Sequence, residues 1–308
     1  MKSSRLKYFG AAISSTAMWG FFSIPLRNLQ AYPSEQILQY RIITSLLITW
    51  LYILLFRRER AASDWKRIRD QRPADRRKTL ILIILAGVLI TGNWYSFIYA
   101  VNHVSLKSAA FAYMVCPLLT AMGGFLILKE HLSPVKLAAI GIAFVSILIL
   151  AKGSLTDVFW SVFIASLYAF YLVIQRVVRE LDKFNMLAIQ LLLSLVLILP
   201  LFISHHGAIP VSPVFWINIL LISVVFTIIP LFLSLYALEG IPSSTMGIII
   251  YVNPVVAFAV AILYFGEEIT SLQAFAYSLL VLAVVVFNSG FLGGFISSRY
   301  RKTMSHPA

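Results

Sequence analysis

Ten apolar stretches of about 18 to 25 residues follow one another from Tyr8 to Phe295. A helix needs roughly 20 apolar residues to cross about 30 Å of hydrocarbon. Because lipid offers no partner for backbone N–H and C=O groups, such runs form helices that pair these groups internally. The sequence therefore predicts an all-α membrane protein with ten transmembrane helices. The expected spans are residues 8–27, 36–56, 79–101, 106–128, 134–151, 157–178, 185–204, 214–238, 243–265 and 272–295.

The composition excludes a water-soluble protein and gives no sign of an enzyme. Hydrophobic residues make up 60% of the 308 residues and charged residues 12%, about half the charged share of soluble domains. The single cysteine, Cys116, lies within an expected span and excludes an intrachain disulfide. The five histidines lack metal-ligand spacing, and no nucleotide-binding or catalytic motif is present. We expect no catalytic residue, no metal and no cofactor.

The net charge of +13 raises the question of nucleic-acid binding. Ten of the 25 basic residues lie in residues 57–78, interspersed with four acidic residues. Such a cluster between two apolar spans is typical of a cytoplasmic loop. The sequence therefore favours a lipid bilayer as the partner of this charge, with no nucleic acid. Contact of this loop with anionic headgroups is also expected.

The distribution of basic residues predicts the orientation. With the N-terminus in the cytoplasm, 21 of the 25 basic residues lie on the cytoplasmic side. An even number of spans places the C-terminus on the same side. We therefore expect a multi-pass protein of the cell (inner) membrane with both termini cytoplasmic. The four remaining basic residues are Arg27, Arg41, Lys107 and Lys152.

An internal repeat is suggested by matching positions in the two halves. A shift of 137 residues places Pro117 on Pro254 and Glu130 on Glu267, and a shift of 149 places Trp19-Gly20 on Tyr168-Ala169. Each half then holds five spans, an odd number, so the second copy enters the membrane inverted. Inverted repeats are typical of alternating-access transporters, although duplication alone would also build a stable bundle. The expected division is 1–152, 153–297 and a cytoplasmic tail at 298–308.

Several segments carry a family resemblance. They are TGNWYSFIYAVNH (91–103), AYMVCPL (112–118), LYAFYLVIQR (167–176), TIIPL (227–231), SSTMGIIIYVNP (243–254) and YFGE (264–267), together with Glu130. Through them nearly the whole chain resembles the drug/metabolite transporter superfamily in its ten-helix EamA form, and most closely the RarD branch. The resemblance implies an exporter or permease of small metabolites.

The expected function is alternating-access transport of small amphipathic metabolites, a class that includes amino acids and related compounds. Two other interpretations stay open at this point: export of aromatic or multidrug compounds, and a membrane scaffold or sensor that transports nothing. The expected partners are a small-molecule substrate and the bilayer, with the protein acting as a monomer or homodimer.

Arg41 is the most informative candidate for substrate binding. It lies one to two turns into the second span, in the outer half, preceded by Tyr40. An intramembrane charge is costly and faces a cavity or a partner. The guanidinium would bind an anionic group of the substrate. Snorkelling to the interface or pairing with Glu35 are the alternatives.

The other candidates are polar or aromatic residues within spans. Amide and ring side chains offer hydrogen bonds and faces for apolar or cationic groups, but they also serve as interhelical contacts. We expect substrate contacts from Asn93, Trp94, Tyr113, Gln190, Tyr251 and Asn253.

Four paired residues are expected to act in structure or gating: Pro117, Pro254, Glu130 and Glu267. Each proline, like Pro25, Pro200 and Pro230, removes a backbone donor and should bend its helix. A carboxylate at a helix C-terminus opposes the helix dipole, so the N-terminus of the following helix, three residues on, is expected to compensate Glu130.

Overall fold

The computed structural model describes residues 2–29, 31–103, 106–150, 155–178, 180–204, 209–266, 271–287 and 289. Within them every regular element is a helix. Six helical segments are long and apolar enough to cross a membrane, and four shorter apolar segments accompany them at 113–128, 134–149, 243–257 and 274–287. The prediction of an all-α membrane protein with ten spans is confirmed.

The first half contains seven helices. They are α1 (Lys2–Gly20), α2 (Ser23–Arg27), α3 (Ser34–Phe56), α4 (Arg58–Arg69), α5 (Pro73–His103), α6 (Leu106–Leu128) and α7 (Pro134–Leu150). The second half contains α8 (Leu155–Val177), α9 (Lys183–Ser204), α10 (Pro213–Ser223), the π-helix η1 (Val224–Ile228), α11 (Ile229–Gly240), α12 (Ser243–Ile249), α13 (Val252–Leu263) and α14 (Ser271–Phe287).

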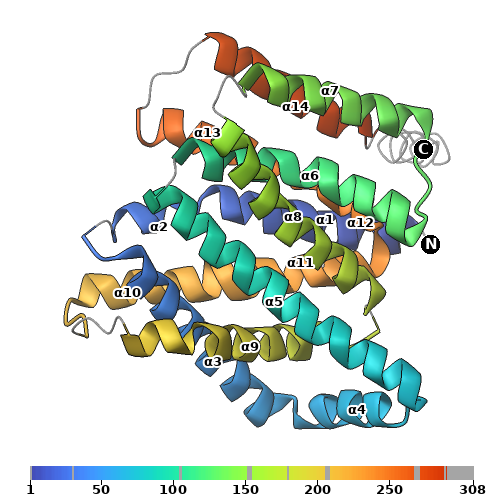
Figure 1. Cartoon of the computed structure of the whole chain (residues 1–308), viewed down its shortest axis with the longest axis vertical. Coiled ribbons are helices and arrows are strands. Elements are labelled where there is room, and N and C mark those ends of the chain that lie inside the picture. The colour runs from blue at the N-terminus through green and yellow to red at the C-terminus, as the bar shows by residue number, and fades with distance from the viewer. Residues whose placement is uncertain are drawn as a thin grey trace, which may run out of the picture.

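The helix contacts repeat between the two halves. Each contact between two helices is matched by a contact between their equivalents in the other half. The contact of α1 with α11 is matched by that of α8 with α5. In the same way, α6 with α8 is matched by α13 with α1, and α5 with α9 by α10 with α3. Equivalent helices also meet as α3 with α9, α6 with α12, and α7 with α14, the last pair side by side at one edge in Figure 1. Exchanging the halves leaves this pattern unchanged, so the predicted inverted five-helix repeats are confirmed.

Two expected spans depart from regular α-helix ahead of a proline. The eighth span contains η1 immediately before Pro230, and the ninth breaks at Ile250–Tyr251 before Pro254. Proline has no N–H, so the carbonyl four residues earlier loses its helical donor. For Pro230 this is the carbonyl of Phe226, which accepts a hydrogen bond from Trp19 Nε1 at 3.0 Å. By contrast, α6 and α9 continue past Pro117 and Pro200.

The basic segment 57–78 is not the simple loop that its charge predicts. It contains α4, and α5 begins at Pro73, six residues before the expected span at 79. Ile68 of α4 is buried at 5% exposure, because one face of this short amphipathic helix lies against the bundle. Pro73 at the first helical position favours the early start of α5.

Gly247 allows α12 to approach α6 closely. A Cβ at Gly247 would lie 2.7 Å from the Cβ of Thr120 and 3.1 Å from the carbonyl oxygen of Pro117. Overpacking of this kind costs about 1–3 kcal/mol, so Gly247→Ala should lower the melting temperature in detergent. Gly141→Ala is the control, because nothing lies within 4 Å of its added Cβ. Equal melting temperatures for the two variants would contradict the close approach.

Candidate functional site

A cavity of about 420 Å³ lies between the two repeats. Its volume falls within the roughly 300–1,000 Å³ range of small-molecule sites. We call it the central cavity. Its lining residues are Trp19, Gly20, Phe22, Ser23, Leu26, Ile37, Leu38, Arg41, Asn93, Trp94, Phe97, Tyr113, Tyr168, Phe226, Thr227, Leu231, Asn253 and Ala257.

The central cavity occupies one half of the bundle's thickness. The end of α1, at Trp19, and the first turns of α3 line it. Tyr8 does not line it, because Tyr8 lies eleven residues before Trp19 on α1, about 16 Å away along the helix. Near Tyr8 the packing is tight. The Tyr8 ring lies 5.0 Å from the Tyr236 ring, and it fills the space that a Cβ at Gly240 would take. The helices α1 and α11 are therefore in close contact around Tyr8, and neither Tyr8 nor Tyr236 lines the central cavity.

Arg41 projects into the central cavity from α3. Its Cζ lies 4.7 Å from the centroid of the Trp94 ring on α5. Its Nε is buried without a hydrogen-bond partner, and in the described part of the chain no carboxylate pairs with it, Glu35 included. A guanidinium matches the planar geometry of a carboxylate or phosphate. The site therefore holds a cation for which the described residues supply no anionic partner.

The two asparagines of the lining differ in their hydrogen bonds. Asn93 is 2% exposed and its Nδ2 donates to the carbonyl of Ile164 on α8 at 2.9 Å, a contact between the repeats. The side chain of Asn253 makes no hydrogen bond to the described residues, although it lines the cavity. Its amide is therefore available as a donor and an acceptor.

Gly20 allows α1 to lie against α13 at the cavity wall. A Cβ at this position would meet the Cβ of Val256 at 2.5 Å and the backbone oxygen of Asn253 at 3.0 Å. A larger residue would force the two helices apart and move Asn253. The glycine therefore helps to place the free amide.

Several aromatic residues line the central cavity but are not among the binding residues predicted from the sequence, notably Trp19, Tyr168 and Phe226. The rings of Trp19 and Tyr168 meet edge to face with centroids 6.0 Å apart, and the Phe226 carbonyl holds the Trp19 indole. Single aromatic residues in apolar spans carry no distinctive signal. The usable signal was the repeat itself, because the 149-residue shift aligns Trp19 with Tyr168.

The structure brings five of the eight expected binding residues into the lining: Arg41, Asn93, Trp94, Tyr113 and Asn253. The other three lie elsewhere. Tyr40 packs on Phe215 and Trp216, with ring centroids 5.5 and 5.1 Å away. Gln190 accepts a hydrogen bond from the Tyr171 hydroxyl at 3.1 Å. Tyr251 is fully buried in a separate apolar cluster.

Glu130 caps a helix, but not the one that follows it in sequence. Its carboxylate accepts hydrogen bonds from Ser243 N at 2.8 Å, Ser243 Oγ at 2.9 Å and Ser244 N at 2.9 Å. These donors form the N-terminus of α12, where negative charge is stabilised. The side chain reaches α12 because α6 ends in a sharp turn with Lys129 at φ 53°. Glu267 lies outside the described residues.

A metal centre has no support within the described residues, where no group of three or more His, Cys, Asp and Glu side chains is placed to hold an ion. The central cavity instead offers one cation, two amides and aromatic walls. This arrangement can bind an amphipathic organic molecule with a negatively charged group. It has no paired acid and base for hydrolysis in its lining.

Comparison with known proteins identifies the class. The model of the EamA-like transporter family matches residues 6–152 and 156–289, once in each half. A solved crystal structure has the same fold, with a TM-score of 0.72 over 92% of this chain and 96% of that chain at 13% identity. The chain belongs to the EamA-like transporter family and is a multi-pass membrane transporter.

Individual relatives agree with this assignment. The uncharacterized transporter YojE of Bacillus subtilis is 29% identical over 89% of this chain and 90% of its own. Protein RarD of Streptomyces exfoliatus is 30% identical over 87% and 84% respectively. Protein RarD of Escherichia coli is 25% identical over 90% and 93%. The predicted membership of the drug/metabolite transporter superfamily, in its RarD branch, is confirmed.

Proposed function

We propose that this transporter moves small amphipathic metabolites that carry a carboxylate, including amino acids or related compounds, across the inner membrane. The observation that carries the proposal is the unpaired guanidinium of Arg41, held over Trp94 inside a cavity that both repeats line. A buried cation without a counter-ion is costly. A substrate carboxylate would supply that counter-ion.

The rest of the lining suits the remainder of such a molecule. The rings of Trp19, Phe97 and Phe226 would cover an apolar side chain, and the free amide of Asn253 would bond to an amino or hydroxyl group. Tyr113, on α6, completes the wall beside Arg41. The site would thus recognise one charged end and one apolar end of the same molecule.

The proposed mechanism is alternating access between the halves. Residues 1–152 and 153–297 would rock against each other, and the described conformation would have its closed end around Tyr8 and Tyr236. With both termini in the cytoplasm, that closed end faces the cytoplasm and the central cavity faces the other side. The clustering of basic residues in segment 57–78 supports this orientation. Since one chain lines the whole cavity, a monomer or a homodimer would serve equally.

A second candidate is export of aromatic compounds without a carboxylate. The aromatic walls favour it, because stacked rings bind planar molecules without needing a charge. The two candidates differ in their dependence on Arg41. A third interpretation, a scaffold or sensor, shares the cavity but predicts no flux.

A binding screen tests the substrate class. Purified protein is heated with matched pairs of carboxylates and their amides, drawn from aromatic and aliphatic amino acids. A ligand at 100 times its dissociation constant stabilises by about 2.7 kcal/mol, so we expect a clear rise in melting temperature with carboxylates. Their amides should bind at least tenfold more weakly. Equal shifts for acid and amide would contradict recognition by Arg41 and favour the aromatic-compound exporter.

A further inference from the structure

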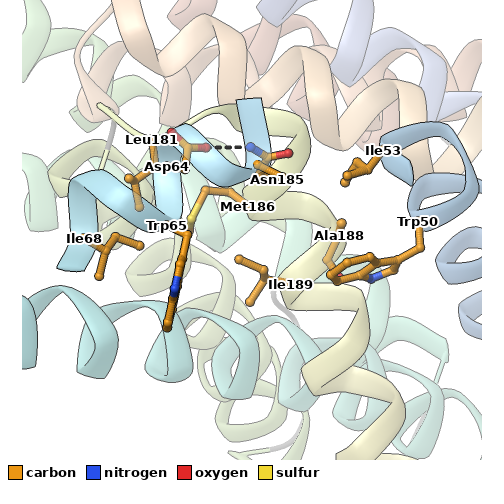
Figure 2. Close-up of a pocket in the computed structure, with 11 residues that line it drawn as sticks. Trp50, Ile53, Asp64, Trp65, Ile68, Leu181, Asn185, Met186, Ala188 and Ile189 are labelled. Atoms are coloured by element: carbon orange, nitrogen blue, oxygen red, sulfur yellow. Dashed lines mark hydrogen bonds between the residues drawn. The ribbon is translucent and has the colours of Figure 1, made fainter. Parts of the chain in front are cut away.

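A second hollow, of about 200 Å³, lies beneath α4 and apart from the central cavity. We call it the α4 pocket. Its walls are Trp50, Ile53, Ala61, Asp64, Trp65, Ile68, Leu181, Asn185, Met186, Ala188 and Ile189. Figure 2 shows Trp65 and Trp50 on either side of Ile189, with Asp64 and Asn185 joined above them. The pocket therefore joins α3 and α4 of the first repeat to α9 of the second.

Polar contacts join α4 and the residue before it to residues 180–185 at the pocket. Arg57 Nη2 lies 2.8 Å from Asp182 Oδ2, and Arg67 Nη1 donates to the Glu180 carbonyl at 2.7 Å. Asp64 Oδ2 accepts from Asn185 Nδ2 at 2.6 Å. Beneath them Ala61, Trp65 and Ile68 of α4 line the pocket.

One buried polar atom in the α4 pocket lacks a partner. Asn185 is 5% exposed, and its Nδ2 is bound to Asp64. Its Oδ1 is consequently an acceptor, and it has no hydrogen bond within the described residues. An unsatisfied buried acceptor destabilises the protein. A ligand with a hydroxyl donor would satisfy it.

The position of the pocket and the basic residues of α4 around it indicate a lipid. Trp50 and Ile53 lie in the last two turns of α3, and Asn185 in the first turn of α9, so the pocket is at one face of the bundle. Trp65 is 61% exposed there, as expected for tryptophan at a membrane interface. The basic residues of α4 are Arg58, Arg60, Lys66, Arg67 and Arg69, which favour an anionic headgroup.

We propose that the α4 pocket binds one anionic phospholipid of the adjoining leaflet, with a hydroxyl-bearing headgroup such as that of phosphatidylglycerol. Part of an acyl chain lies between Trp50, Trp65 and Ile189. The phosphate lies against the basic side chains of α4, and a headgroup hydroxyl donates to Asn185 Oδ1. Bound in this way, the lipid joins the two repeats at this surface. The site does not depend on which substrate the central cavity takes.

Native mass spectrometry of the full-length protein in detergent tests the site, with phosphatidylglycerol, phosphatidylethanolamine and phosphatidylcholine titrated in turn. We expect one phosphatidylglycerol to bind at least tenfold more tightly than either other lipid. Ala61→Trp fills the pocket and should remove this binding. Ala62→Trp adds the same ring to the exposed side of α4 and should preserve it.

A charge variant gives a second test that adds no bulk to the pocket, although Arg60 Nη1 also lies 3.8 Å from Asp182 Oδ2. The Arg60 side chain is 69% exposed, and removing one basic group near a headgroup should weaken phosphatidylglycerol binding about fivefold. Arg72→Gln, at an 88% exposed position beyond α4, should leave it unchanged. Equal affinity for the three lipids, or tight binding retained in both Ala61→Trp and Arg60→Gln, would overturn the proposal.

Discussion

Arg41→Gln should strongly weaken carboxylate binding while leaving the fold intact or more stable. Removing one partner of a buried, hydrogen-bonded charge pair costs about 2–5 kcal/mol, so the affinity for the best carboxylate should fall at least about 30-fold. Arg41 has no ion-pair partner in the described chain and its Nε is unsatisfied. Neutralising it therefore removes a buried charge that no carboxylate among the described residues compensates.

Two further variants sharpen this test. Arg41→Lys keeps the charge but loses the planar fork that fits a carboxylate, so it should bind with intermediate affinity. Arg27→Gln removes an exposed cation at the same end of the bundle, above the Phe265 ring at 3.9 Å, and should bind normally. Isothermal titration with the same ligand compares all four proteins. Unchanged affinity in Arg41→Gln would remove this residue from the substrate site.

Glu130→Ala should produce the largest loss of stability among single substitutions at the helix ends. It leaves three donors at the N-terminus of α12 without their acceptor. Charge-assisted hydrogen bonds contribute about 1.5–3 kcal/mol each and are not additive, and loss of a helix cap costs about 0.5–2 kcal/mol. We expect a loss of about 2–4 kcal/mol, measured as reduced thermal stability in detergent.

Related variants separate the cap from a general loss of charge. Glu130→Gln keeps the shape but turns an amide N–H toward a backbone donor, so its loss should be intermediate. Gly124→Ala should reproduce part of the effect, because a Cβ there would lie 2.5 Å from Glu130 Oε2. Glu59→Gln, on the exposed face of α4, should have little effect. A fully stable Glu130→Ala protein would show that the cap is dispensable.

The ten spans can be predicted from the sequence, but the side of each helix that faces the protein interior cannot. Length and apolarity alone locate the ten spans, since the bilayer allows few alternatives. The same spans are apolar on all sides, so their sequence does not say which face is inward. Arg41 and Gln190 show the consequence. A charge must find a cavity, and Arg41 does. The amide oxygen of Gln190 instead accepts a hydrogen bond from Tyr171 in the packed interior, while its Nε2 has no partner among the described residues.

Local departures from the expected fold have identifiable causes. The many charged residues of segment 57–78 predict a loop, so α4 is not expected. Ala61, Trp65 and Ile68 nevertheless follow the spacing of an amphipathic helix. The Glu130 cap depends on a helix 113 residues further along the chain, and sequence spacing does not report such contacts. The position of Pro230 in the sequence predicts that the Phe226 carbonyl loses its helical donor. It does not predict that Trp19 Nε1 donates a hydrogen bond to this carbonyl.

Flux measured in proteoliposomes tests most directly whether the central cavity is a transport site. The vesicles are preloaded with the carboxylate that binds most tightly, and exchange of external labelled compound is followed for the original protein and for Arg41→Gln. We predict saturable exchange with the original protein and a loss of at least tenfold with the variant. Tight binding without any exchange would contradict the account, and would identify the protein as a binding scaffold or sensor.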